Sequence, residues 1–251
     1  MKKELPLFMQ AEPVLKIVTQ SVPKNTKAYF IGGAIRNALI YHYFNEKLPP
    51  RDFDILLIGD SKEFISNLRA KGFTYDKIKR KNQVVLKIKK FSGAKKINDY
   101  VWLDIHLSKK GNILDNLREN ANFTINSFAL PLSSAISDNW IRKVVYLPGA
   151  LGDLRSRKMR LNKVSHPADL YACIRFVSKG FEKPSKDEVN SLLEGLAKFH
   201  KAKFNRNVKK VFVYVGSEKK ARRIARDLGI KEDIFSFKTI ELLRVFANQT
   251  K

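Results

Sequence analysis

Cysteine is nearly absent from this sequence, and long apolar runs are missing. Cys173 is the single cysteine in 251 residues, which excludes a disulfide framework and a cysteine-rich zinc site and is typical of the reducing cytoplasm. No stretch of about 18 uncharged apolar residues occurs, so we do not expect the chain to span a membrane. Pro6 and charged residues interrupt the first residues, where a secretory signal needs an apolar run. We therefore expect a cytoplasmic protein.

Acidic residues are scarce relative to basic ones. The sequence has 49 Lys and Arg against 24 Asp and Glu, a formal net charge of +25. With 44% hydrophobic and 11% aromatic residues, the chain can bury a core, which excludes a disordered polycation. The excess charge points to a polyanionic partner, because each Lys or Arg near a phosphate releases condensed counterions. Nucleic acid is the first candidate and an anionic membrane surface the second; a solvated basic surface without a dedicated partner is the remaining alternative.

Hydrophobic spacing differs between the two parts of the chain. Strand and helix patterns alternate up to about residue 148, and only helical patterns follow. We therefore predict an α+β fold, with a mixed sheet and helices first and an all-helical part second. The expected strands cover residues 28–31, 54–58, 84–89, 101–107 and 144–147, and the expected helices cover residues 12–22, 34–44, 62–71, 170–180, 186–201, 206–215, 218–228 and 234–247.

A run of basic residues lies in the helical part. Residues 201–226 include ten Lys or Arg and a single acid, Glu218. Such a run usually forms a solvated helix face, but the charge of the whole chain favours a surface that faces RNA. The side chains expected to contact RNA are Lys209, Lys210, Lys219, Lys220, Arg222, Arg223 and Arg226.

Asp52 and Asp54 begin an apolar strand. Residues two apart in a strand project from the same face, so the two carboxylates can address one point. Such a pair suits Mg²⁺, a hard ion that takes oxygen ligands and keeps positions for substrate phosphates. A lone Asp-x-Asp is common, and its ordinary role is to face water where a strand starts.

A glycine pair and a third acid accompany these two carboxylates. Gly32 and Gly33 lie between an expected strand and a helix that carries Arg36, where backbone N–H groups can approach a phosphate. Asp104 interrupts an apolar strand, either as a third carboxylate at the metal site or as a solvent-facing residue at a sheet edge. Three acids beside a glycine turn suit two-metal nucleotidyl transfer. The histidines show no metal-ligand spacing, so a structural or surface role is expected for them, although His106 could lie near the site of Asp104.

Four segments, taken together, resemble the signatures of one family. They are residues 30–36 with 51–55, residues 123–129, residues 148–154 with Arg160, and a segment that ends at Arg175 and Phe176. Phe-Thr-Ile-Asn in the second and Gly-Asp-Leu in the third match most closely. In order and spacing the segments resemble the bacterial class II tRNA nucleotidyltransferases, or CCA-adding enzymes, and the bacterial poly(A) polymerases.

The resemblance implies a polymerase-β-like nucleotidyltransferase head over residues 1–147 and a helical neck with a shortened body over residues 148–251. It implies template-independent addition of nucleotides from ATP, CTP or both to an RNA 3′ end, with Mg²⁺ as cofactor and tRNA as acceptor. Asp52 and Asp54 would bind the metal ions, and Asp104 would be the third catalytic carboxylate. The residues implied to bind the nucleotide are Gly32, Gly33, Arg36, Asn126, Asp153 and Arg160.

Several residues depart from the family pattern. Asn37 stands where an Asp follows the glycine-loop Arg, and Ala121 and Asn122 stand where the family has Arg-Asp. In the neck, Asp169 and Ala172 replace two Arg whose paired donors read the edges of C and A. We therefore expect altered base selection, as in partial C-C-A or poly(A)-type addition; the alternative is an RNA-binding homologue with lost or restricted catalysis. Because the helical part is short, a homodimer or a helper protein would supply the rest of the body.

Overall fold

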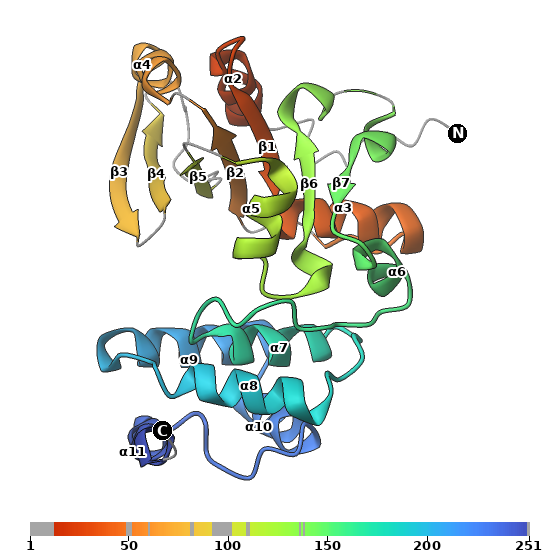
Figure 1. The fold of residues 1–251 in the computed structure, drawn as a ribbon, viewed down its shortest axis with the longest axis vertical. Coiled ribbons are helices and arrows are strands. Elements are labelled where there is room, and N and C mark those ends of the chain that lie inside the picture. Colours follow the sequence, from red (N-terminus) through yellow and green to blue (C-terminus); the bar gives the residue numbers. More distant parts are fainter. Residues whose placement is uncertain are drawn as a thin grey trace. The chain divides into compact units, whose positions relative to one another are not determined.

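The chain divides into two compact units. A computed structural model describes residues 13–48, 52–59, 61–80, 83–91, 102–108, 111–135, 137 and 139–249. The first unit comprises residues 1–118 and 126–150, and the second comprises residues 119–125 and 151–251. The α+β class predicted from the sequence is confirmed (Figure 1), because a mixed sheet with helices forms the first unit and the described elements of the second are helices.

The first unit contains a seven-stranded mixed sheet in the order β3-β4-β5-β2-β1-β6-β7. β2 and β5 run parallel, and the other neighbouring strands are antiparallel. The strands are β1 (Lys27–Ile31), β2 (Asp52–Ile58), β3 (Phe73–Arg80), β4 (Gln83–Phe91), β5 (Trp102–Ser108), β6 (Phe128–Pro131) and β7 (Val145–Tyr146).

The composition of β2 explains its place in the middle of the sheet. Phe53 is 3% exposed, and Ile55 and Leu57 are fully buried. A strand covered on both faces needs a nearly continuous apolar run, and residues 53–58 provide one. Asp54 is the polar interruption of this run, and it is only partly buried.

Helices cover the sheet. α3 (Gly33–Phe44) contacts β1, β2 and β6, and α5 (Ile113–Asn120) packs through Leu117 against Ala129 and the partly buried Ile31. None of the described helices is long and apolar enough to cross a membrane. The remaining elements of this unit are α2 (Pro13–Ser21), α4 (Lys62–Ala70), the 3₁₀ turns η2 (Leu132–Ser134) and η3 (Trp140–Lys143), and η1 (Thr124–Asn126), which joins the two units along the chain.

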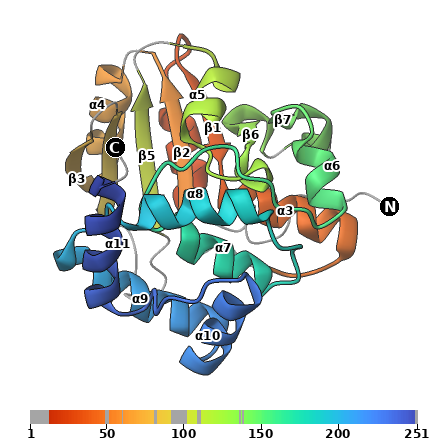
Figure 2. The same cartoon turned by 60° about the horizontal axis from the view of Figure 1, so that its bottom comes forward.

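The second unit is built around α7 (Asp169–Val177), which packs against α8, α9 and α10 (Figure 2). Tyr171 of α7 donates a hydrogen bond to the Ile234 carbonyl at 2.7 Å, and its ring stacks on Phe235 with centroids 5.9 Å apart. Burial raises the pKa of Tyr171 well above its ordinary value. The other helices are α6 (Ala150–Arg155), α8 (Lys186–Leu196), α9 (Lys201–Val215), α10 (Glu218–Asp227) and α11 (Phe237–Gln249).

The boundary between α8 and α9 differs from the prediction. α8 ends at Leu196 and α9 begins at Lys201, where the sequence predicts one helix up to residue 201 and the next from residue 206. Arg244 of α11 donates to the Phe199 carbonyl at 2.7 Å and to the Ala197 carbonyl at 3.2 Å. A side chain distant in sequence therefore donates to these carbonyls, which the N–H groups of a continuous helix would otherwise do. β3, β6, α5 and α6 have no counterpart among the predicted elements.

Candidate active site

Two glycines form the turn between β1 and α3. Gly32 has a φ of +69°, a left-handed conformation that residues with a Cβ adopt only at a cost. Its N–H donates to the Phe128 carbonyl at 3.3 Å, and it occupies the N-cap position of α3 without a side-chain cap. The turn thus exposes backbone at a helix N-terminus, where N–H groups and the helix dipole favour an anion.

Asp54 lies directly beside this turn. It pairs with Ile31 of β1, the residue before Gly32. A Cβ built on Gly32 would lie 3.8 Å from Asp54 Oδ2, which is van der Waals contact. The structure therefore brings together the glycine turn and one carboxylate of the predicted pair. The Asp52 side chain lies outside the described residues, although its backbone begins β2.

Asp104 is the register partner of Asp54 across the parallel β2–β5 pair. Residues paired in this way point to the same face of the sheet, so both carboxylates belong to one face. β5 lies between β4 and β2, so an explanation of Asp104 as a residue of a sheet edge is wrong. Among the described side chains, which leave out Asp52, no group of three or more His, Cys, Asp or Glu is arranged to hold a metal ion.

His106 also belongs to this face; the sequence allowed it a place near Asp104 but favoured a structural or surface role. Its Nε2 lies 3.0 Å from Asp54 Oδ1, and the His106 and Asp54 side chains are 12% and 33% exposed. His106 follows Asp104 by two residues in β5, so strand alternation was the signal that could have placed it here. The pairing of β5 with β2, which brings it to Asp54, was not visible in the local sequence.

Arg36 of α3 is buried, with 9% of the residue exposed. Its Nε and Nη2 donate to Asn37 Oδ1 at 3.2 and 3.0 Å, and its Nη1 donates to Asn126 Oδ1. A Cβ built on Gly33 would lie 3.4 Å from Arg36 Nη2. Amide oxygens of Asn37 and Asn126 therefore hold the guanidinium against the glycine turn. Asn37, a departure from the family pattern, still supplies the acceptor.

Asp153 and Arg160 belong to the second unit and bind each other. Arg160 Nε donates to Asp153 Oδ2 at 2.8 Å, and the side chains of Arg160 and Asp153 are 58% and 8% exposed. This hydrogen bond raises the pKa of Arg160. The Arg160 carbonyl also accepts from the Thr124 N–H at 3.0 Å, which connects the third signature to the second. The exposed guanidinium is thus the part of this pair that a ligand can reach.

Asp169 is 5% exposed, and its carboxylate is occupied by the chain itself. Oδ2 accepts from the backbone N–H groups of Ser165 and His166, both at 2.8 Å, and Oδ1 accepts from Asn122 Nδ2 at 3.0 Å. Asp169 therefore fastens the loop that precedes α7. Ala172 is 6% exposed and is part of the core of this unit.

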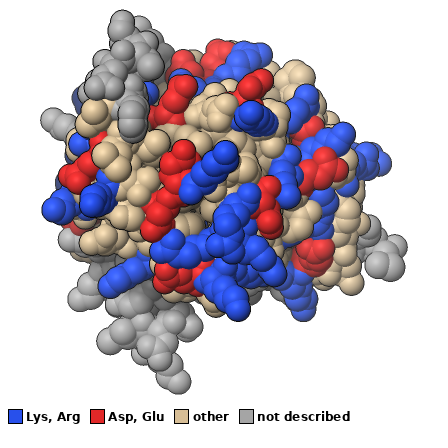
Figure 3. Space-filling view, turned by 90° about the horizontal axis from the view of Figure 1, so that it is seen from below, with Lys and Arg blue, Asp and Glu red and all other residues tan. Residues whose placement is uncertain are grey.

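The basic residues of α10 occupy one face of the helix. Ala221, Ile224 and Ala225 are buried, and the opposite face carries the exposed side chains of Lys219, Lys220, Arg223 and Arg226. Lys209 and Lys210 are exposed on α9. Figure 3 shows Lys and Arg side chains gathered on the face seen from below, with fewer acidic side chains among them.

Arg222, one of the predicted RNA contacts, is part of an ion-pair network. It donates to Glu218 Oε1 at 2.7 Å and to Asp233 Oδ1 at 2.6 Å. Its guanidinium also lies over the Phe235 ring, 5.3 Å from the centroid. The hydrogen bond with Glu218 is the largest of the causes that raise the pKa of Arg222. This geometry favours a structural role.

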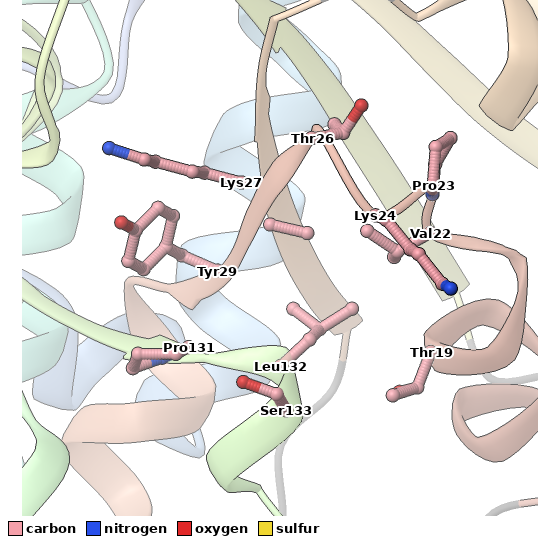
Figure 4. Close-up of a pocket in the computed structure, with 11 residues that line it drawn as sticks. Thr19, Val22, Pro23, Lys24, Thr26, Lys27, Tyr29, Pro131, Leu132 and Ser133 are labelled. Carbon is pink, nitrogen blue, oxygen red and sulfur yellow. The ribbon is translucent and has the colours of Figure 1, made fainter.

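A cavity of about 360 Å³ opens at the other end of β1 from the glycine turn (Figure 4). Lys24 and Lys27 are the charged residues of its lining. In Figure 4 the two ammonium groups point away from each other. They do not converge on one point.

Solved structures with this fold include tRNA-processing enzymes. The Thermotoga maritima CCA-adding enzyme complexed with tRNA has a TM-score of 0.62 at 16% identity, over 91% of this chain and 54% of that chain. A CCA-adding enzyme complexed with ATP has a TM-score of 0.62 at 16% identity, over 91% of this chain and 55% of that one. A tRNA-processing enzyme in an apo form has a TM-score of 0.60 at 18% identity, over 90% and 58%. No family model and no curated protein matches the sequence.

At such low identity the likeness shows the fold. The chain has the α+β head and helical neck fold of CCA-adding enzymes. It spans between 54% and 58% of the length of the solved chains, so it covers little more than half of each.

Proposed function

We propose that this protein adds nucleotides from a nucleoside triphosphate to an RNA 3′ end without a template, with tRNA as the acceptor. The observation that carries the proposal is the juxtaposition of the Gly32 turn, Asp54 and Asp104 on one part of the sheet. A phosphate-binding turn beside carboxylates is the arrangement that nucleotidyl transfer needs, because phosphates and their metal ions must meet. The shared fold with CCA-adding enzymes, solved with tRNA, CTP and ATP, supports this choice.

The donor set fits Mg²⁺. Asp54 and Asp104 provide carboxylate oxygens on one face, and Mg²⁺ prefers oxygen ligands; we propose that Asp52 completes the set. Bound there, Mg²⁺ would neutralise triphosphate charge and stabilise the leaving pyrophosphate. The carboxylates of this chain would hold the cation beside the glycine turn.

The triphosphate binds, in this proposal, at the N-terminus of α3. Gly32 and Gly33 allow phosphate oxygens to approach the backbone, and the Arg36 guanidinium lies against the turn. Asn126 orients this guanidinium from the opposite side.

The basic face of α10 and the exposed lysines of α9 would bind the RNA backbone. Their cations project into solvent, where release of condensed counterions drives binding to phosphates. The proposed contacts are Lys209, Lys210, Lys219, Lys220, Arg223 and Arg226, and Arg222 is left out because it is engaged in ion pairs.

Base selection would differ from that of an ordinary C-C-A addition. Asp169 and Ala172 stand where the family pattern has arginines, and Asp169 is buried and hydrogen-bonded to its own loop. Neither side chain can present paired donors to the edge of a base. The same observation favours a second candidate, an RNA-binding protein of this fold without productive transfer.

A matrix of substrates and acceptors separates these candidates. The protein would be incubated with Mg²⁺ and each labelled nucleoside triphosphate in turn, with tRNA lacking its C-C-A end, tRNA ending in C-C, or an unrelated RNA. Asp54→Asn is the test variant, and Glu63→Gln, an exposed residue of α4, is the matched control. Transfer lost only in Asp54→Asn supports the enzyme, and the preferred pairing names its substrates. Tight RNA binding without transfer in any pairing supports the second candidate.

A further inference from the structure

The two oxygens of the Asp54 carboxylate have different neighbours. Oδ1 lies 3.0 Å from His106 Nε2. Oδ2 is the atom that a Cβ on Gly32 would meet at 3.8 Å. His106 and the glycine turn thus flank the carboxylate from two sides.

We propose that His106 is a positioning residue, which fixes the Asp54 carboxylate so that Oδ2 faces the glycine turn and a divalent cation there. The inference rests on the proposed function, because it assigns Asp54 to the metal. A carboxylate oxygen can only accept, so Nε2 donates in this contact. Without such a donor the carboxylate torsion of an aspartate is broad, and Asp54, with 33% of its side chain exposed, would sample many orientations.

His106 itself is held in place by the sheet. It lies in an interior strand, with Leu56 as its partner in β2 and Val85 as its partner in β4. Only 12% of its side chain is exposed. A ring restricted in this way is a fixed donor, and a fixed donor lowers the entropy that Asp54 would lose on binding a cation.

His106 lies outside the four segments that resemble the family signatures. The role proposed for it therefore comes from the geometry of this chain. Partners that orient metal-ligating carboxylates typically change metal affinity or activity about 10- to 100-fold when they are removed. We therefore expect the loss of His106 to weaken metal binding by a factor in this range.

The test compares three substitutions of His106 that differ in whether the side chain has an N–H donor and in how far that donor extends. His106→Gln keeps an N–H donor at nearly the reach of Nε2, His106→Asn keeps the amide on a shorter side chain, and His106→Leu removes the donor. The first readout is binding of Mn²⁺ alone, followed by the electron paramagnetic resonance signal of the free ion. The second is the Mg²⁺ concentration for half-maximal RNA extension, together with the KM for RNA.

We expect His106→Leu and His106→Asn to weaken Mn²⁺ binding about tenfold or more, and His106→Gln to stay within about threefold of the wild type. The half-maximal Mg²⁺ concentration should rise in the same order, with the KM for RNA unchanged. If His106→Leu fails to fold, the comparison of His106→Gln with His106→Asn decides. Asp54→Asn provides the reference for loss of the site.

Three results would overturn the proposal: unchanged Mn²⁺ binding in His106→Asn and His106→Leu, equal weakening in all three variants, or wild-type binding no tighter than that of Asp54→Asn. Failure of the proposed function looks different. If Mn²⁺ binding weakens in the expected order and the wild type still extends no RNA, the proposed nucleotidyl transfer is wrong and the positioning role of His106 is supported. If the wild type extends RNA and His106→Leu needs no more Mg²⁺, only the positioning role falls.

Discussion

Asn122 and Asp169 are hydrogen-bonded to each other, with Asn122 Nδ2 donating to Asp169 Oδ1 at 3.0 Å. Both residues depart from the pattern of the family that the chain resembles, so two changes far apart in sequence meet in one contact. The other Asp169 oxygen accepts from the N–H groups of Ser165 and His166. Asp169, at a position that would read a base in that family, thus links two loops through its contact with Asn122 here.

Replacement of Asp169 tests this structural role. Asp169→Ala would leave the Ser165 and His166 N–H groups without their acceptor, and we expect the free energy of unfolding to fall by about 2–3 kcal/mol. Urea denaturation measures the loss. Asp227→Ala, at an exposed position near the end of α10, is the matched control and should change stability by less than about 0.5 kcal/mol. Equal effects of the two substitutions would contradict the assignment.

Replacement of Gly32 tests the glycine turn. Gly32→Ala puts a methyl group 3.8 Å from Asp54 Oδ2 and forces alanine into a φ of +69° with a ψ of −131°, at a cost of about 1–3 kcal/mol. We expect the KM for the triphosphate to rise about tenfold or more. Gly180→Ala is the control, because it forces alanine into a φ of +84° where a Cβ meets nothing within 4 Å; it should cost stability to a similar extent and leave the KM for the triphosphate unchanged. Activity kept in Gly32→Ala would argue against a phosphate site at the turn.

Much of the sheet, and part of the site, could be predicted from local pattern. The apolar run of β2 and the glycines before α3 are both visible in the sequence, and Asp54 and Gly32 do meet. β3 was missed because Phe73–Arg80 mixes charged and apolar residues without a clear alternation. Between α8 and α9, the Ala197 and Phe199 carbonyls accept hydrogen bonds from Arg244, more than 40 residues away, a contact that no local pattern encodes. The contact of His106 with Asp54 follows from the register between β2 and β5, which no local pattern encodes.

Two neighbouring arginines of α10, Arg222 and Arg223, are expected to differ in what they contribute to stability and to RNA binding. Arg222 is paired with Glu218 and Asp233, so Arg222→Ala should lower the free energy of unfolding by about 1 kcal/mol with little effect on RNA affinity. Arg223 is exposed on the basic face. Arg223→Ala should leave stability within about 0.5 kcal/mol and reduce the slope of log affinity against log salt by about 0.7 for single-stranded RNA. Filter binding at several salt concentrations measures the slope, and an unchanged slope would remove Arg223 from the RNA surface.

The buried thiol of Cys173 makes stability depend on pH in the alkaline range. Burial, with a smaller contribution from Glu188, raises the pKa of Cys173 to about 12, against about 8.5 in an unfolded chain. Both states hold the proton below about pH 8.5. Above it the unfolded state loses its proton first, so stability falls as the pH rises toward 12. Urea midpoints between about pH 8 and 9.5 should fall more steeply for the wild type than for Cys173→Ala. Parallel curves would contradict the assignment.

The most direct test of the account is single-turnover extension of an end-labelled RNA by the wild type and by Asp104→Asn, with RNA affinity and thermal midpoint measured on the same samples. Asp104 shares a register position and a sheet face with Asp54, so loss of its charge should reduce extension about 100-fold or more while affinity and midpoint stay unchanged. Extension by Asp104→Asn at the wild-type rate, from a folded protein that binds RNA normally, would contradict the claim that this face of the sheet carries nucleotidyl transfer.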